Sequence, residues 1–287
     1  VVLFMVAWLI MGWVFGWIWQ ALDPGSWLTP ESAEVIAALV GEALILGTYF
    51  WGGGAALALA GAKKAPPEQY PQLHALADSL SYGAGVPKPE LYVIDDPSPN
   101  AFATGRDARN GSLAVTTGLL EKLDREELEG VLAHEMTHIR NHDVMLLLMV
   151  AMMVGAAALV ASLCWQVVRS SRSLRVDLVA GLIGLVTALF GFVVGPLMQF
   201  ALSRSRESLA DAGAAELTRN PQGILKALEK IAANDQPLKD FTHTTAAMFI
   251  DNPLEHHDAW WHRLFDTHPP MSERIRALQS IAEVRET

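Results

Sequence analysis

Long apolar stretches alternate along the chain with segments of ordinary polar and charged composition. A helix needs about 20 mostly apolar residues to cross a lipid bilayer, and each stretch approaches that length. One such helix would be compatible with the core of a soluble protein, but four in one chain are typical of an integral membrane protein. The sequence therefore predicts four transmembrane helices, at residues 2–19, 35–60, 144–165 and 178–200.

Between and after the apolar stretches, the residue pattern predicts a mixed domain of helices and short strands. Runs rich in β-forming residues predict strands at residues 90–94, 100–104 and 112–115. Helices are predicted at residues 69–82, 123–141, 221–233 and 271–284. Asp124, followed by Glu126 and Glu127, is an N-terminal signal for the second of these helices. We therefore expect a mainly α integral membrane protein whose four transmembrane helices carry an α+β domain with a small β-sheet.

The composition narrows the classes of partner. Hydrophobic residues make up 51% of the chain and charged residues 18%, against about 25% charged residues in typical soluble domains. The net charge of -10 argues against a nucleic acid partner, because no basic face is available to neutralise phosphates. The single cysteine, Cys164, excludes an internal disulfide. No basic segment precedes the first apolar stretch, so we expect no cleavable signal peptide.

The strongest chemical signal is the sequence HEMTH, which runs from His134 to His138. Residues four apart lie on one face of a helix, so both imidazoles can reach one metal ion, with Glu135 beside them. The alternative is a pair of surface histidines on a helix. Apolar residues at Leu128 and Val131 indicate that the motif lies on a partly buried helix, which favours a zinc peptidase site.

A catalytic zinc site needs a third protein ligand. The extended motif with a third histidine does not fit, because Asn141 and Val144 occupy its glycine and histidine positions. The third ligand is therefore expected on another helix, and Glu207 is the candidate. Asp211 lies one helical turn later and could accept a ring N–H from a ligating histidine. The alternative for this segment is an exposed polar helix face.

The chain around both motifs contains no obvious helix breaker. No Pro or Gly interrupts residues 139–144 or 201–207, so each motif-bearing helix is expected to continue into an apolar stretch. Metal bound there would lie just outside the hydrocarbon core. His142 and Asp143 are interpreted as structural or solvated residues, with a contact to a ligating histidine as the alternative.

Four motifs together carry a resemblance to a known family. They are NAFATG at residues 100–105, HEMTH at 134–138, SRSRESLAD at 203–211 and THPPMSERI at 267–275. Their content and order resemble the HtpX family of membrane zinc metalloproteases, which is related to the CAAX prenyl proteases. The resemblance implies a zincin-like catalytic domain facing the cytoplasm at a bacterial inner membrane. It also implies one zinc ion per subunit and a role in the quality control of membrane proteins.

The resemblance assigns roles residue by residue. It makes three residues the zinc ligands of a gluzincin-type site, namely His134, His138 and Glu207. Glu135 is then the general base, and Asn100 falls where relatives have a strand asparagine near the substrate. His268 and Arg274 fall where relatives have groups near the transition-state oxygen. Ser208 departs from the family pattern, which usually has an aromatic residue after the ligand glutamate.

The distribution of charge predicts the orientation in the membrane. Lysine and arginine are enriched in cytoplasmic segments, and the side that carries the motifs contains Lys63, Lys64, Arg140, Arg204 and Arg206. The active site is therefore predicted to face the cytoplasm, although Arg169, Arg172 and Arg175 in the loop between the last two apolar stretches oppose this orientation. The predicted organisation is a membrane hairpin at residues 1–64, catalytic segments at 65–143 and 203–287, and a second membrane hairpin at 144–202.

The expected function is endopeptidase cleavage of misfolded or membrane proteins near the cytoplasmic membrane surface. Its partners are then protein or peptide substrates and the lipid bilayer. One alternative is a CAAX-type prenyl protease. Another is a zinc-binding transporter or non-catalytic scaffold. Transport would need ionisable residues along the spans, where Glu42 is the one candidate, and a scaffold without activity would be expected to lack Glu135.

Overall fold

The computed structural model describes residues 2–22, 24–25, 27–170, 174–234, 248–251 and 269–286. The chain divides into two compact units. The first comprises Val1–Phe50 and Met152–Gly195, and the second comprises Trp51–Ala151 and Pro196–Thr287. The helices α2, α6 and α7 contribute residues to both units.

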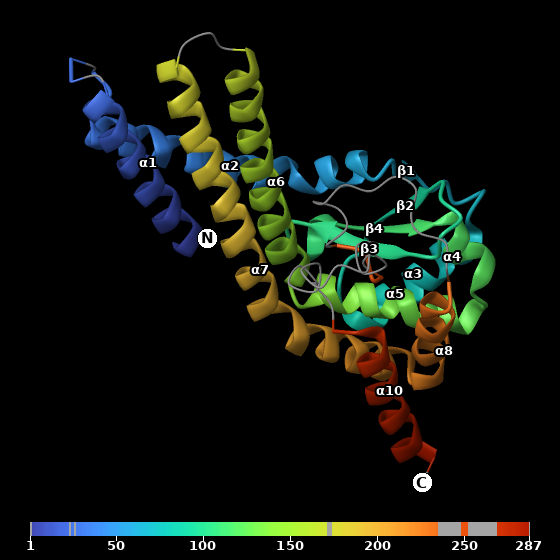
Figure 1. Cartoon of the computed structure of the whole chain (residues 1–287). Coiled ribbons are helices and arrows are strands. Elements are labelled where there is room, and N and C mark those ends of the chain that lie inside the picture. The colour runs from blue at the N-terminus through green and yellow to red at the C-terminus, as the bar shows by residue number, and fades with distance from the viewer. Residues whose placement is uncertain are drawn as a thin grey trace. The chain divides into compact units, whose positions relative to one another are not determined.

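The first unit is helical. Its helices are α1 (Val2–Leu22), the beginning of α2 (Pro30–Leu59), most of α6 (Asp143–Ser170) and the first part of α7 (Leu174–Thr218) (Figure 1). Each apolar stretch of the sequence thus lies in a helix. By length and composition over the described residues, one helix, α2, could cross a membrane. A Cβ on Gly12 would collide with Ala37, so this glycine lets α1 and α2 approach closely.

The second unit contains a four-stranded sheet. Its strands are β1 (Lys63–Lys64), β2 (Glu90–Ile94), β3 (Ala101–Gly105) and β4 (Gly111–Thr116). They lie in the order β1-β2-β4-β3, with β2 and β4 parallel and the two outer pairs antiparallel. The predicted strand at residues 90–94 is confirmed at both ends, and the other two strands lie within one residue of their predicted positions. Strand β1 was not predicted, because two lysines carry no β-forming signal.

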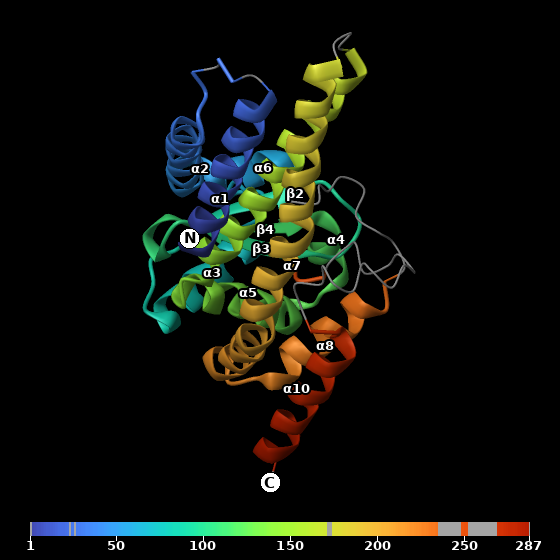
Figure 2. The ribbon, with the colours of Figure 1, turned by 60° about the vertical axis from the view of Figure 1, so that its left-hand side comes forward.

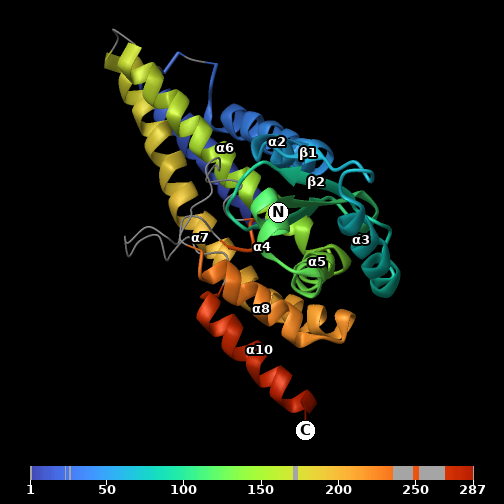
Figure 3. The same cartoon turned by 90° about the vertical axis from the view of Figure 1, so that its right-hand side faces the viewer.

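The second unit also has helices of its own. They are α3 (Pro71–Ala84), α4 (Thr117–Lys122), α5 (Arg125–Arg140), α8 (Pro221–Ala232) and α10 (Met271–Glu286), with a 3₁₀ turn, η1, at Ala108–Asn110. Figure 2 shows the sheet above α5, and α5 in turn packs on α8, which packs on α10 (Figure 3). The helix α5 begins with a capping box, in which Asp124 and Glu127 each accept a backbone N–H from the other residue.

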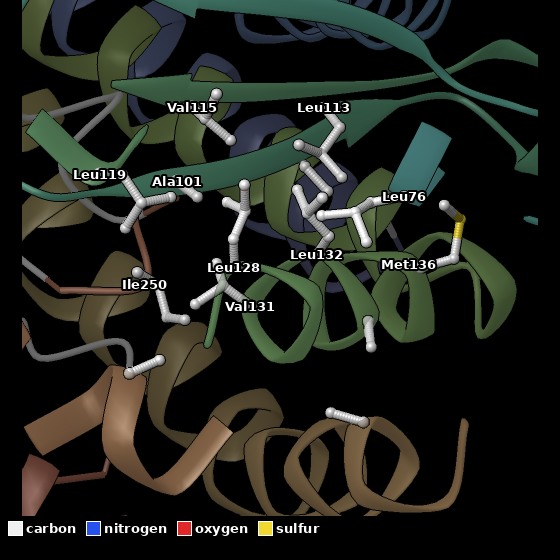
Figure 4. Close-up of a cluster of buried hydrophobic side chains, with 14 of the residues drawn as sticks. Leu76, Ala101, Leu113, Val115, Leu119, Leu128, Val131, Leu132, Met136 and Ile250 are labelled. Atoms are coloured by element: carbon white, nitrogen blue, oxygen red, sulfur yellow. The ribbon is translucent and has the colours of Figure 1, made fainter. Parts of the chain in front are cut away.

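A single hydrophobic core joins α5 to the sheet. Leu113 of β4 lies opposite Leu132 of α5, and Val131 contributes from the same helix (Figure 4). All three side chains are fully buried, and each contributes about 1.5–3 kcal/mol on burial. This packing fixes the rotation of α5 about its axis, and so it sets the directions in which the motif side chains point.

The expected continuous helix through residues 139–144 is absent. Helix α5 ends at Arg140, and α6 begins at Asp143. Between them His142 has φ 60, a left-handed conformation that no helix interior accommodates. Histidine tolerates this conformation better than most residues, so the break needs neither glycine nor proline. By contrast, α7 runs without interruption through residues 201–207, as expected.

Candidate metal centre

Two helices bring three candidate ligands to one point. His134 and His138 extend from α5, and Glu207 extends from α7. All three side chains are buried. The two Nε2 atoms are 3.2 Å apart. Glu207 Oε2 lies 3.5 Å from His134 Nε2 and Glu207 Oε1 lies 3.4 Å from His138 Nε2. In the described part of the chain, this is the group of histidine and carboxylate side chains that could hold a metal ion.

The spacing of these atoms fits zinc. Zinc bonds of about 2.0–2.1 Å in a tetrahedral site require ligand atoms about 3.3–3.4 Å apart. The three observed separations, 3.2, 3.4 and 3.5 Å, lie close to that requirement. Two imidazoles and one carboxylate are also a common ligand set of catalytic zinc, which leaves one coordination position for water or substrate.

Each candidate histidine is held by a carboxylate at its other ring nitrogen. Asp211 Oδ1 lies 2.9 Å from His134 Nδ1, and Asp143 Oδ2 lies 3.2 Å from His138 Nδ1. Carboxylates in these positions accept the Nδ1 protons and leave both Nε2 lone pairs directed at the metal. Asp211 was predicted to make this contact, whereas for Asp143 a contact with a ligating histidine was the alternative to a structural or solvated role. The turn at His142 brings Asp143 back toward His138, and no glycine or proline in the sequence marks this turn.

A glycine allows α7 to lie close enough to α5 for Glu207 to reach the histidines. A Cβ on Gly213 would lie 2.6 Å from Thr137 Cγ2, which is far inside van der Waals contact. Thr137 is itself buried and donates its hydroxyl hydrogen to the carbonyl of Ala133 one turn earlier. Only glycine therefore fits at this helix crossing without displacing α7.

The electrostatics of the site favour a bound cation. Burial by itself lowers the pKa of His138, but the charge of Glu207 and hydrogen bonding to Asp143 and Glu207 outweigh it and raise this pKa to about 10. The pKa of His134 is also raised, because hydrogen bonds to Asp211 and Glu207 outweigh its burial. The raised pKa values mean that the imidazole nitrogens hold a proton firmly, and these are the atoms to which a metal ion would bind.

A charge count leads to the same conclusion. The site contains four buried carboxylates, at Glu135, Asp143, Glu207 and Asp211. It also contains two guanidinium groups, those of Arg206, which lies 3.4 Å from Asp143, and Arg274, which lies 2.7 Å from Asp211. With neutral imidazoles, two negative charges remain, which matches one divalent ion. A buried excess charge of this size is costly without such a counter-ion.

Arg274 is buried behind the candidate ligands. Its Nε and Nη2 atoms lie 3.0 and 2.7 Å from the two oxygens of Asp211, as a bidentate pair. Its Nη1 lies 3.6 Å from Glu207 Oε2. Burial lowers the pKa of Arg274, but the charge of Asp211 outweighs this effect and raises it. Burial likewise raises the pKa of Asp211, yet Arg274 and His134 hold it well below its usual range. Arg274 is therefore a permanent positive charge at the back of the site.

Three further residues were predicted to belong to the site, namely Glu135, Asn100 and His268, and the structure describes the first two of them. Glu135 is buried on α5, and its charge helps to raise the pKa values of His138 and Arg274, so it lies within electrostatic reach of both. Asn100 is buried at the beginning of β3, where its side chain bonds to the backbone of Asp251. His268 lies outside the described residues.

Comparison with known proteins relates the chain to a peptidase family. The model of Peptidase family M48 matches residues 67–282. A protein named Protease HtpX homolog from Dictyoglomus thermophilum is 45% identical over 229 residues, which cover 79% of this chain and 75% of that protein. A second protein of that name, from Ligilactobacillus salivarius, is 37% identical over 278 residues, which cover 93% of each chain.

Among solved structures, the crystal structure of S. mikatae Ste24p is similar, with a TM-score of 0.50 and 17% sequence identity. The similarity covers 93% of this chain, which spans 61% of the Ste24p chain. At that level of identity the likeness concerns the fold alone. The fold is that of a helical membrane metalloprotease with a small sheet.

Proposed function

Because this chain belongs to peptidase family M48 and is a membrane-bound metalloprotease, we propose that it uses one zinc ion to hydrolyse peptide bonds within proteins. The observation that carries the proposal is the triangle of His134, His138 and Glu207, whose ligand atoms have the spacing of a tetrahedral zinc site. Bound zinc would supply a Lewis acid for the scissile carbonyl and would activate water for attack at neutral pH.

The roles of the protein groups follow from their positions. Glu135 is next to the first ligand in the sequence and is buried on the same helix, so we assign it as the general base. It takes a proton from the attacking water and passes it to the departing amine, a role worth about 10²–10⁴-fold in rate. Asp211 and Asp143 hold the imidazole rings in the required orientation and tautomer.

The resemblance implied that Arg274 and His268 lie near the transition-state oxygen. The guanidinium of Arg274 is already engaged in its bidentate pair with Asp211. We therefore propose that Arg274 stabilises the arrangement of the ligands by its charge. His268 remains the proposed donor to the transition-state oxygen, on the basis of its position in the motif THPPMSERI.

We propose that all four apolar helices cross the membrane and that the metal centre faces the cytoplasm. The catalytic domain then comprises residues 65–143 and 203–287, and residues 1–64 and 144–202 form two membrane hairpins. The support is the length of the apolar stretches and the excess of lysine and arginine on the side of the motifs. A direct test replaces Cys164 with serine, introduces single cysteines at Glu31 and Asp107, and labels intact cells with a membrane-impermeant maleimide. Labelling at Glu31 alone is expected, and labelling at Asp107 would contradict the proposed orientation.

Proteins of the membrane, misfolded ones in particular, are the proposed substrates, cleaved near the cytoplasmic surface. Relatives that are 45% identical are named as HtpX homologs, and this supports a role in protein quality control more than CAAX processing, for which the support is a likeness of fold. Neither a transporter nor an inactive scaffold accounts for Glu135 beside His134, His138 and Glu207, a group that could hold a metal ion.

The decisive experiment compares the purified protein with its Glu135→Gln variant on an unfolded protein and on a model membrane protein. The wild-type protein should cleave within the chains and contain about one zinc ion per subunit. The Glu135→Gln variant should retain zinc but lose cleavage, whereas the control Glu129→Gln, on the same helix, should behave as wild type. Loss of zinc from Glu135→Gln would make this residue a ligand, and unchanged turnover would remove it from the mechanism.

A further inference from the structure

The side chain of Asn100, the residue before β3, forms hydrogen bonds of the kind that the backbone of a neighbouring strand would form. Its Nδ2 donates to the carbonyl of Asp251 at 2.7 Å. Its Oδ1 accepts the backbone N–H of Asp251 at 3.2 Å and that of Ala101 at 3.0 Å. One amide side chain thus pairs with the Asp251 peptide in both directions, as a neighbouring strand would. Asn100 is 1% exposed.

The neighbouring residue, Ile250, continues this pairing and extends it to the metal centre. Its N–H donates to the carbonyl of Ala101 at 2.9 Å, and its carbonyl accepts a hydrogen bond from Nη1 of Arg274 at 3.4 Å. The Ile250 side chain points into the core toward α5 (Figure 4). Phe249 packs edge-on against Phe102 of β3, with ring centroids 5.0 Å apart. The segment Met248–Asp251 is therefore fixed between the edge strand and Arg274.

Arg274 connects this segment to the candidate metal centre. The guanidinium group that bonds to Ile250 also holds Asp211 and lies 3.4 Å from both ring nitrogens of His134. A peptide that shifts away from Arg274 removes one of its fixed partners in a buried site, where a lost hydrogen bond is costly. The position of His134 then depends on Asn100 through Asp251, Ile250, Arg274 and Asp211.

We propose that Asn100 is a positioning residue, which fixes Arg274 through the Met248–Asp251 segment and so keeps His134 and Asp211 in the metal-binding arrangement. The inference rests on the proposed function. It also revises the expectation from the sequence, where the resemblance implied that Asn100 lies near the substrate. The carboxamide is engaged with the chain's own backbone, and its effect reaches the reaction through Arg274. The carbonyl of Ala101 is engaged as well, so an extended substrate does not pair with β3 at this residue.

The test is a double-mutant cycle between Asn100→Ala and Arg274→Lys, with Asn110→Ala as control. Asn110 is an exposed asparagine on the same unit. Three quantities are measured: kcat and KM on a peptide substrate, zinc affinity by competition with a chelator, and hydrogen exchange of the segment 248–251. If Asn100→Ala does not fold, Asn100→Asp takes its place, because it keeps the acceptor oxygen and removes the donor to Asp251.

The proposal expects Asn100→Ala to lower kcat and zinc affinity by about 10-fold each, with KM changed less than 2-fold. The amides of Ile250 and Asp251 should exchange faster, and Asn100→Ala should add little further loss in the Arg274→Lys background. A rise in KM with unchanged kcat and zinc affinity would make Asn100 a substrate contact and overturn the proposal. Fully additive losses would overturn it as well.

Failure of the proposed function would have a different signature. A wild-type protein that binds zinc but cleaves no peptide would contradict the assigned reaction. The zinc affinity and hydrogen exchange of the variants would still decide the role of Asn100, since neither measurement requires turnover.

Discussion

Asp143 Oδ2 lies 3.2 Å from Nδ1 of His138, although a helix end and a left-handed residue separate the two in the chain. Asp143 is also the first residue of α6, and its other oxygen lies 3.4 Å from Nη1 of Arg206 on α7. One carboxylate therefore joins the imidazole of a candidate metal ligand to two further helices. Asp143 thus contacts Nδ1 of His138 in the way that Asp211 contacts Nδ1 of His134.

Asp143→Asn should weaken zinc binding by about 10–100-fold, the usual effect of losing a carboxylate partner of a ligating histidine. The amide is the same size but can present its N–H₂ group to the ring, which favours the wrong tautomer of His138. Zinc affinity measured against a chelator tests this expectation. Asp78→Asn, which removes an exposed carboxylate paired with Lys88, is the matched control. Equal zinc affinity in the two variants would show that the ring needs no such partner.

Glu207→Ala should lose both zinc and cleavage. Two imidazoles alone hold zinc weakly, because they leave two of the four coordination positions without a protein ligand. Glu216→Ala, an exposed glutamate on the same helix, should retain both. The zinc content of the two purified variants is the measurement. Stoichiometric, tightly bound zinc in Glu207→Ala would mean that the third ligand is another residue.

Removal of the metal should give the protein a pH-dependent stability. The pKa of His138 rises from an ordinary 6.5 to about 10 in the metal-free site, so its proton stabilises the folded state fully below pH 6.5. This stabilisation is lost as pH rises from 6.5 toward 10. Zinc competes with the same proton, so its affinity should increase over the same range. Melting temperatures of chelated and zinc-loaded protein between pH 6.5 and 10 test both statements. A chelated protein that melts at one temperature throughout would contradict them.

Gly213→Ala should destabilise the protein by about 1–3 kcal/mol, the usual cost of overpacking a buried contact. The new Cβ would lie 2.6 Å from Thr137 Cγ2, so α7 must move away from α5 and carry Glu207 with it. Zinc affinity should therefore fall along with the unfolding midpoint. Adding Thr137→Ala should recover both, because it removes the colliding methyl group. A single Gly213→Ala variant that is more stable than wild type would show that helix propensity outweighs the close contact.

The parts of the fold that could be predicted are those whose residues carry a local signal. The strand Glu90–Ile94 is a short run of β-forming residues, and α5 begins at the capping signal of Asp124. The histidines of HEMTH follow from helical spacing, because α5 presents both on one face. Glu207 could be proposed only by combining the need for a third ligand with the family resemblance. Its reach to α5 depends on the close contact of Gly213 with Thr137.

The features that could not be predicted depend on contacts between distant residues or on an unmarked backbone conformation. His142 adopts a left-handed conformation without the glycine that usually marks one, so the end of α5 was placed too late. For this reason the contact of Asp143 with His138 was expected only as the alternative to a structural or solvated role. The pairing of Asn100 with Asp251 joins residues 151 positions apart, and no periodicity of the sequence encodes such a contact.

The candidate ligands lie on two helices, α5 and α7, and this has a consequence while the chain is being synthesised. Residues 144–202 separate His138 from Glu207 in the sequence, and ribosomes add roughly 5–20 residues per second. A nascent chain therefore exposes HEMTH for several seconds before Glu207 has been made. During that interval the growing polypeptide has two imidazoles and no third ligand. The three candidate ligands are therefore present together only after residues 144–202 have been synthesised, so a chain at this stage cannot yet hydrolyse neighbouring proteins by the proposed mechanism.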